Sequence, residues 1–337
     1  MSTRSILGLV YTLRGLRELG EDIEPVLSRF GLDLDRLDPG ARIDRALELR
    51  LYIELSQQLK DPVAGLRTGT FFGFTGYGPL TMLLLTCNNA YEAFQTGVRY
   101  QQLTFLFSRL GFEPGANASA LTLQPLQLPE KAFRFRVDGE TSGTYKLIRD
   151  MQATLGMDVR AEAIFIPYPR PPEARAYEDH FQCPVHFGET ADIRCLMRND
   201  YLQTRFPTAD SAAHALFRQQ CDAQIQQQEA VQLEKLPEQV QAYLALFGAG
   251  FPSALEVATA FDIPERSFRR QLSQQGSSFR ALLDTVKQQK AQTLLQDKRL
   301  SVEAIAQQLG YAESAAFIHA FQRWTGSTPA AFRNRQS

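Results

Sequence analysis

Residues 253–272 read SALEVATAFDIPERSFRRQL and are followed by GSSF at 276–279, and this stretch determines how the last third of the chain folds. The sequence SVEAIAQQLGYAESAAFIHAF at 301–321, followed by GSTP at 326–329, repeats the pattern. Each copy predicts a short helix with one apolar face, a tight turn and a second helix with an exposed polar face. The sequence therefore predicts two helix-turn-helix units.

The first copy carries its own start and stop signals. Ser253 is followed three residues later by Glu256, which is the pattern of a capping box, so a helix is expected to begin there. Residues 262–264 interrupt this helix, and the proline at their end opens the next one. On that second helix, Phe268 and Leu272 are expected to face the core.

The outward face of the same helix is basic. Arginine guanidinium groups make bidentate hydrogen bonds to guanine and also bind phosphates, so these side chains are predicted to contact a DNA major groove. A solvated helix face without a partner is the competing interpretation. The predicted contacts of the first copy are Arg266, Arg269, Arg270 and Ser273.

In the second copy, Gly310 is expected to supply the left-handed turn residue, and Phe317 and Phe321 the core face. His319 is interpreted either as a DNA contact or as an inert surface histidine. Trp324 is interpreted as a core anchor. The predicted contacts of the second copy are Ser314, His319, Gln322 and Arg323.

The distribution of charge supports contact with a polyanion at one end of the chain. The whole chain of 337 residues has a net charge of −1, but residues 235–337 contain 12 Lys and Arg against 8 Asp and Glu, a net +4. The rest carries 24 basic and 29 acidic residues, a net −5. The basic third is therefore predicted to bind DNA phosphates, and the acidic part to stay away from them.

Composition indicates a cytoplasmic protein without a membrane segment. The longest nearly apolar run, 79–87, is far shorter than the roughly 20 residues of a membrane span, and no export signal is visible. The four cysteines are scattered and are expected to be reduced thiols. His180, Cys183 and His186 have a spacing that suits a metal, but Pro184 lies between them and no second pair follows, so neither metal nor cofactor is expected.

Hydrophobic periodicity predicts an α+β fold with a helical N-terminal domain and a small antiparallel sheet, followed by an all-α C-terminal domain. The predicted domains are 1–210, a Gln-rich helical linker at 211–236, and a DNA-binding domain at 237–337. Helices are expected at 6–19, 23–30, 47–59, 90–110 and 141–155, a loop at 71–79, and strands at 121–124, 133–137, 162–167, 185–187 and 193–197.

Both halves resemble known protein families. The C-terminal part resembles the AraC/XylS transcription regulators through the residues Ile305, Ala306, 309–311 (LGY), Phe317, Phe321, 323–326 (RWTG), Thr328, Pro329, Phe332 and Arg333. The N-terminal part resembles the arabinose-binding-type domain of one branch of that family, through 78–80 (GPL), 89–93 (NAYEA), Arg99, Tyr100 and 183–188 (CPVHFG).

The resemblance implies two helix-turn-helix units joined by a long helix at about 278–296, reading successive major grooves. It implies an activator that binds double-stranded promoter DNA as a homodimer, contacts RNA polymerase and responds to a small molecule. This sequence departs from the pattern at Ala312 and Ala315, where members often carry Ser or Asp and Ser, respectively. The first copy is therefore expected to carry more of the specificity.

An apolar effector is expected beside the Gly-broken aromatic stretch 71–79, which cannot pack regularly and precedes the apolar helix 80–85. A plain aromatic core is the competing interpretation. Two other functions remain as alternatives: a DNA-binding protein without an effector, and an enzyme fused to a DNA-binding domain. The chain has neither a Gly-x-Ser-x-Gly elbow nor a Walker loop, so we do not expect an enzyme. The predicted effector contacts are Phe71, Phe72, Phe74, Tyr77 and Tyr100.

Overall fold

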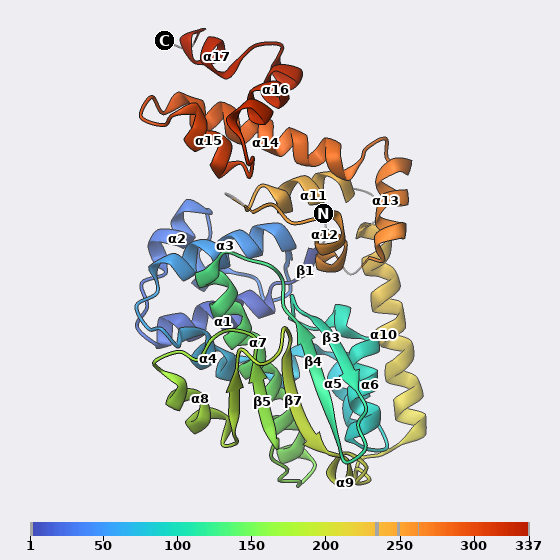
Figure 1. The fold of residues 1–337 in the computed structure, drawn as a ribbon. Helices are drawn as coiled ribbons and strands as arrows, with labels where there is room; N and C mark the ends of the chain where they lie inside the picture. Colours follow the sequence, from blue (N-terminus) through green and yellow to red (C-terminus); the bar gives the residue numbers. More distant parts are fainter. Residues whose placement is uncertain (1–2, 233–235, 248–249, 262, 336–337) are drawn as a thin grey trace. The chain divides into compact units, whose positions relative to one another are not determined.

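The computed structural model describes residues 3–232, 236–247, 250–261 and 263–335 (Figure 1). The chain divides into two compact units, one spanning Thr3–Val231 and the other beginning at Gln232. The first unit combines helices with two small sheets, and the described residues of the second unit form helices. The protein therefore has the α+β architecture that the sequence predicts.

A five-stranded sheet forms one layer of the first unit, with the strand order β3-β4-β7-β5-β6. Its neighbouring strands are antiparallel except for β5 and β6, which are parallel. A separate antiparallel pair joins β1 (Thr3–Ser5) to β2 (Arg42–Asp44). The strands of the larger sheet are β3 (Arg109–Glu113), β4 (Ala118–Gln124), β5 (Ala163–Ile166), β6 (Val185–Phe187) and β7 (Ile193–Arg198).

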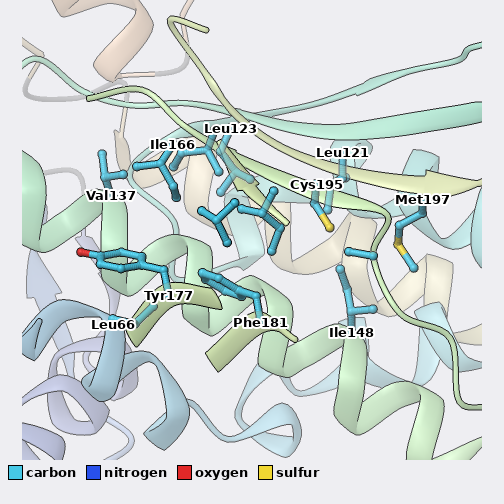
Figure 2. Close-up of a cluster of buried hydrophobic side chains, with 14 of the residues drawn as sticks. Leu66, Leu121, Leu123, Val137, Ile148, Ile166, Tyr177, Phe181, Cys195 and Met197 are labelled. Atoms are coloured by element: carbon cyan, nitrogen blue, oxygen red, sulfur yellow. The ribbon is translucent and has the colours of Figure 1, made fainter. Parts of the chain in front are cut away.

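Helix α7 (Glu130–Thr154) packs against this sheet and is the longest helix in Figure 1. Val137 and Ile148 on the helix belong to one buried apolar cluster with Leu121 and Met197 on the strands (Figure 2). Removing these side chains from water is the main stabilising contribution of the layer.

Helix α4 (Ala64–Thr68) crosses α7 at very short range. A Cβ atom on Gly65 would lie 2.4 Å from the carbonyl oxygen of Phe135, and a Cβ atom on Gly69 would lie 2.4 Å from the side chain of Ser142. Only glycine permits this approach of the two backbones. As a result, α7 is covered by helices as well as by the sheet.

The predicted strand at 133–137 is wrong, because these residues form the first turns of α7. The alternation of Phe and Arg resembles a strand with one face in water. Arg136, however, is buried and forms an ion pair with Glu140 at 2.6 Å, one helical turn further on. A two-residue alternation indicates a strand only when its polar members reach solvent.

The predicted helix at 90–110 ends early. Helix α6 (Ala90–Arg99) stops at Tyr100, and strand β3 begins ten residues later at Arg109. Tyr100 is buried, and its hydroxyl donates to Asp222 Oδ1 at 2.7 Å. The side chain of Gln101 then accepts a hydrogen bond from the backbone N–H of Leu110, which stabilises the change of direction.

The stretch 71–79, predicted as a loop, begins at the last residue of one short 3-10 helix, Gly69–Phe71, and contains a second one, Phe74–Tyr77. Gly78 has φ of 58°, in the left-handed region, and leads into α5 (Pro79–Leu85). The other helices up to residue 202 are α1 (Leu7–Glu18), α2 (Glu24–Arg29), α3 (Arg45–Gln58), α8 (Ala174–Phe181) and α9 (Asn199–Leu202), and the first three confirm predicted helices.

Helix α10 (Ser211–Gln232) occupies most of the predicted linker. Cys221 is fully buried, and Phe217 and Ile225 pack against the apolar cluster that contains Leu84. The helix therefore packs onto the first unit along this face. The linker residues 233–235 lie outside the described residues.

The second unit consists of seven helices in its described residues, and α14 is the longest of them. Their order along the chain is that of two helix-turn-helix units separated by one long helix. They are α11 (Leu236–Leu244), α12 (Ala254–Ala260), α13 (Glu265–Gln274), α14 (Phe279–Gln296), α15 (Val302–Gln308), α16 (Ser314–Thr325) and α17 (Pro329–Arg335).

Candidate DNA interface and effector cavity

The first helix-turn-helix unit begins with the predicted capping box. Ser253 accepts from the backbone N–H of Glu256 at 3.2 Å, and the Glu256 side chain accepts from the backbone N–H of Ser253 at 2.6 Å. Phe268 and Leu272 on α13 are fully buried, as predicted. Asp262, part of the predicted helix break, lies outside the described residues. The buried pair fixes which face of α13 points outward.

The outward face of α13 presents Arg266, Arg269, Arg270 and Ser273 to solvent. Arg269 donates to Glu265 Oε1 at 2.8 Å and 2.6 Å, within the same helix. Arg266 and Arg270 form no ion pair with any residue that the structure describes. Their guanidinium groups are thus accessible to an external anion, as contact with DNA would require.

The second helix-turn-helix has the same framework as the first and fewer polar side chains on its exposed face. Gly310 has φ of 75°, as predicted, and Phe317 and Phe321 on α16 are fully buried. Ser314 is half-buried, whereas His319 and Gln322 are exposed. Trp324 packs against the cluster that contains both phenylalanines, which confirms it as a core anchor.

Arg323 differs from the arginines of α13, because it is bound to another helix. Its Nη2 atom lies 3.1 Å from Asp284 Oδ2 on α14. The positions where the sequence departs from the family pattern, Ala312 and Ala315, are exposed and offer no hydrogen-bonding group. The second helix-turn-helix therefore offers fewer polar groups than the first helix-turn-helix to a DNA groove.

Helix α14 connects the two helix-turn-helix units, and its Lys287 contacts an aromatic ring on either side of it. Lys287 Nζ lies 5.1 Å from the ring centre of Phe251 and 4.5 Å from that of Tyr311, one aromatic from each side. Burial lowers the pKa of Lys287, and the nearby Asp284 opposes this shift. The two cation–π contacts help to keep both units on one rigid helix.

The five predicted effector contacts lie in different surroundings. Phe72 and Tyr77 are buried together around Phe105, with ring centres 6.1 Å and 4.4 Å from it. Phe74 packs at the edge of the same cluster. Phe71 packs against α1, where a Cβ atom on Gly15 would lie 2.9 Å from its ring.

Tyr100 serves to attach α10. Burial and the hydrogen bond to Asp222 raise the pKa of Tyr100 to about 12. Arg99 lies 3.9 Å from the same carboxylate. Helix α6 is therefore held to α10 at its C-terminal end.

An apolar cavity of about 60 Å³ lies where α5, α6, α7 and the sheet meet. Of the five predicted residues, Tyr77 lines it, and burial raises the pKa of this tyrosine. Helix α7 contributes lining residues at helical spacing, which a sequence search for a second apolar stripe facing α6 could have found. The principal further residues are Leu84, Phe94, Gly97, Leu147, Ile148 and Met151.

The histidines with metal spacing have separate partners. His180 Nε2 lies 2.9 Å from Ser142 Oγ, whereas His186 Nδ1 lies 3.1 Å from Glu189 Oε1. In the part of the chain that the structure describes, no three His, Cys, Asp or Glu side chains converge as metal ligands do. None of its helices is long and apolar enough to cross a membrane.

Comparison with known proteins agrees with this geometry. Residues 20–206 match the family model of the arabinose-binding domain of AraC transcription regulators, N-terminal, and residues 257–335 match a helix-turn-helix domain model. A protein with such a sensor-type domain and a double helix-turn-helix unit is a DNA-binding transcription regulator. The chain belongs to the AraC family of these regulators, in the branch with an arabinose-binding-type N-terminal domain.

Individual relatives are also transcription regulators. The chain is 28% identical over 282 residues to the HTH-type transcriptional regulator VqsM of Pseudomonas aeruginosa, covering 80% of this chain and 83% of that protein. It is 28% identical over 276 residues to the ornithine utilization regulator of the same organism, covering 81% and 79%. The crystal structure of the transcriptional regulator CdpR from Pseudomonas aeruginosa aligns with a TM-score of 0.48 and 24% identity over 93% of this chain and 96% of that one.

Proposed function

We propose that this regulator recognises its operator mainly through α13 and that a small apolar effector in the α5–α6–α7 cavity controls it. The observation that carries the proposal is the exposed arginine face of α13, opposite the buried Phe268 and Leu272. Arginine is the side chain best suited to bidentate contact with guanine. Helix α16 supports binding through Ser314, His319, Gln322 and Arg323.

Selection from a random duplex library with the full chain, followed by variants, tests this assignment. We expect Arg266→Ala, Arg269→Ala and Arg270→Ala each to weaken operator binding, and a base contact to cost about 1 to 3 kcal/mol at one position. A phosphate contact would weaken all sequences alike and lower the salt dependence.

The matched control is Arg175→Ala on α8, where the side chain is exposed and distant in sequence from the DNA-binding unit. This control should leave operator affinity unchanged. Equal affinity of the three α13 variants and the unaltered protein would show that the arginine face is only solvated.

The effector proposal rests on the lining of the cavity, where the described residues include no charged side chain. The name of one relative refers to ornithine utilization. Ornithine carries charged amino and carboxylate groups, and burying them in this cavity without partners would cost several kcal/mol. We therefore propose a different, apolar effector for this chain, with Tyr77 as a direct contact and Phe71, Phe72 and Phe74 shaping the surrounding wall.

Coupling to DNA binding would run through α6, which lines the cavity and also holds α10 through the bond from Tyr100 to Asp222. Tyr100→Phe removes this hydrogen bond and keeps the buried ring. We expect effector binding by Tyr100→Phe to persist while its effect on operator affinity, typically 1 to 3 kcal/mol of coupling, decreases. An unchanged effector response in Tyr100→Phe would exclude this route.

We also propose that the protein acts as a homodimeric activator that contacts RNA polymerase. The support is membership of the family, in which regulators commonly act on paired half-sites. Sedimentation of the full chain on and off DNA, together with transcription in vitro from the selected operator, measures both points. A monomer on DNA, or repression of transcription, would contradict them.

A further inference from the structure

Two apolar cavities of the first unit share one wall. Ala93 and Phe94 on α6 and Ile148 and Met151 on α7 line both the 60 Å³ cavity and a neighbouring cavity of about 30 Å³. The smaller cavity extends towards α9 and strand β7. The two cavities are therefore neighbours between the same pair of helices.

The cavities follow each other along the two helices. On α7 the larger cavity begins at Thr144 and the smaller one ends at Leu155, which spans about 16 Å at 1.5 Å per residue. On α6 the order is reversed, with Gly97 at the larger cavity and Ala90 at the smaller one. The two cavities therefore lie end to end between the antiparallel helices α6 and α7.

The dimensions favour a thin ligand. The two cavities together measure about 90 Å³, less than the roughly 150 Å³ of a cavity that holds one benzene ring, so any ligand must displace lining side chains, and a thin ligand displaces the fewest. Met151 lies in the shared wall, and its unbranched thioether side chain can change rotamer at little cost. A rotamer change of this kind would join the two spaces without moving a helix.

Gln152 and Tyr201 are the polar side chains that line the smaller cavity, whereas the larger cavity is lined by the hydroxyl-bearing Tyr77, Thr104 and Thr144 among apolar residues. Tyr201 on α9 is 43% exposed, so the smaller cavity reaches the surface of the first unit at this residue. Gln152 lines the same cavity, and its Oε1 atom accepts from Arg149 Nη1 at 2.9 Å. The amide group of Gln152 also carries N–H donors, which a hydroxyl or carboxylate can accept.

We propose that α6 and α7 form one slot that binds an unbranched aliphatic chain with a single polar end group. The chain lies between Ala93, Phe94, Ile148 and Met151, and the hydroxyl or carboxylate lies at Gln152 and Tyr201. This inference rests on the proposed apolar effector and names its chemical class.

Thermal-shift and calorimetric titrations of the full chain with linear alkanols and carboxylates, from hexanol and hexanoate to dodecanol and dodecanoate, test the proposal. Cyclohexanol and cyclooctanol serve as compact probes. We expect binding to tighten with chain length through the series, because each buried methylene adds about 0.8 kcal/mol, close to a fourfold change in affinity.

Gly97→Leu shortens the slot. A Cβ atom at Gly97 would meet only Leu110 at 3.8 Å and Leu84 at 4.0 Å, so the new side chain fits and fills the larger cavity. We expect this variant to bind hexanol normally and dodecanol at least tenfold more weakly. Gln95→Leu, exposed on the same helix, is the matched control and should retain the full dependence on chain length.

The possible outcomes are distinct. Stabilisation by the compact alcohols without any response to the linear series overturns the aliphatic slot and leaves the apolar effector. A linear series that binds equally well to Gly97→Leu and to the unaltered protein places the chain elsewhere and also overturns the slot. No response to either series overturns the slot and the proposed effector function together.

Discussion

Helix α7 in the first unit and helix α13 in the second place their charges in opposite environments. On α7, Arg136, Asp138 and Glu140 are at most 5% exposed. On α13, Arg266 and Arg270 are exposed to solvent. Arg136 and Glu140 of α7 pair with each other inside the core and fix its packing, whereas the exposed arginines of α13 remain accessible to a partner. The same residue types should therefore affect stability in one region and affinity in the other.

The largest effect is expected from the buried ion pair. Burial opposes the charge of Glu140, yet Arg136 and the N–H of Phe107 hold the pKa of this carboxyl below its usual range. Glu140→Gln leaves Arg136 without its closest partner, so the free energy of unfolding should fall by about 3 to 5 kcal/mol in urea titrations. Glu178→Gln, in an exposed pair with Arg170, is the control and should cost less than about 1 kcal/mol. Equal losses of unfolding free energy in the two variants would show that the buried pair contributes no more to stability than the exposed pair.

The next effect depends on pH. Asp138 is surrounded by Tyr168, Tyr177 and Arg134; burial raises its pKa to about 7, against the hydrogen bonds from both tyrosines. Since the unfolded value is about 3.9, protonated Asp138 stabilises the fold at low pH, and this contribution is lost as the pH rises through about 7. Asp138→Asn keeps a neutral group.

Relative to the unaltered protein, Asp138→Asn should therefore gain about 2 kcal/mol of stability between pH 5 and pH 8. Urea unfolding of both proteins across that range measures the difference. A difference independent of pH would mean that Asp138 is ionised throughout, as a group in water would be.

A smaller effect is expected from the pair on α13. Glu265→Gln releases Arg269 and removes a negative charge from the surface that we propose faces DNA. Operator affinity should rise about threefold, under 1 kcal/mol, while stability falls by no more than about 0.5 kcal/mol. Fluorescence anisotropy at several salt concentrations and thermal unfolding measure the two quantities. Lower affinity would indicate that Glu265 itself contacts a base.

The smallest effect is expected from His319→Ala on α16. The side chain is exposed and contacts DNA through one imidazole ring, so operator affinity should fall about twofold, with stability unchanged within about 0.5 kcal/mol. No change would make His319 an inert surface residue. A tenfold loss would instead show that the second helix-turn-helix contributes as much to DNA recognition as the first helix-turn-helix.

The framework of the second unit could be predicted from the sequence because its determinants are local. The capping box at Ser253 and Glu256 and the left-handed Gly310 act within a few residues of themselves. The core positions Phe268 and Phe317 follow the helical period. Each signal is independent of what the distant chain does.

The first unit was less predictable because its determinants are not local. The burial of the Arg136–Glu140 pair beneath Phe107, and the approach of Gly65 to α7, depend on elements far apart in the chain. The cavity requires side chains from α5, α6, α7 and the sheet at once, so the aromatic stretch 71–79 led to Tyr77 but not to Gly97 or Met151.

If both helix-turn-helix units bind one operator, as the family resemblance implies, the long helix α14 restricts the operator as well as the protein. Its 18 residues measure about 27 Å at 1.5 Å per residue, whereas successive turns of B-DNA are about 34 Å apart. A helix of this kind cannot stretch, and one base pair inserted between two recognition elements changes their phase by about a tenth of a turn. Any error in phase must therefore be absorbed by bending or twisting the DNA, which costs free energy that depends on the sequence between the elements. The intervening base pairs thus carry information even where no side chain touches them.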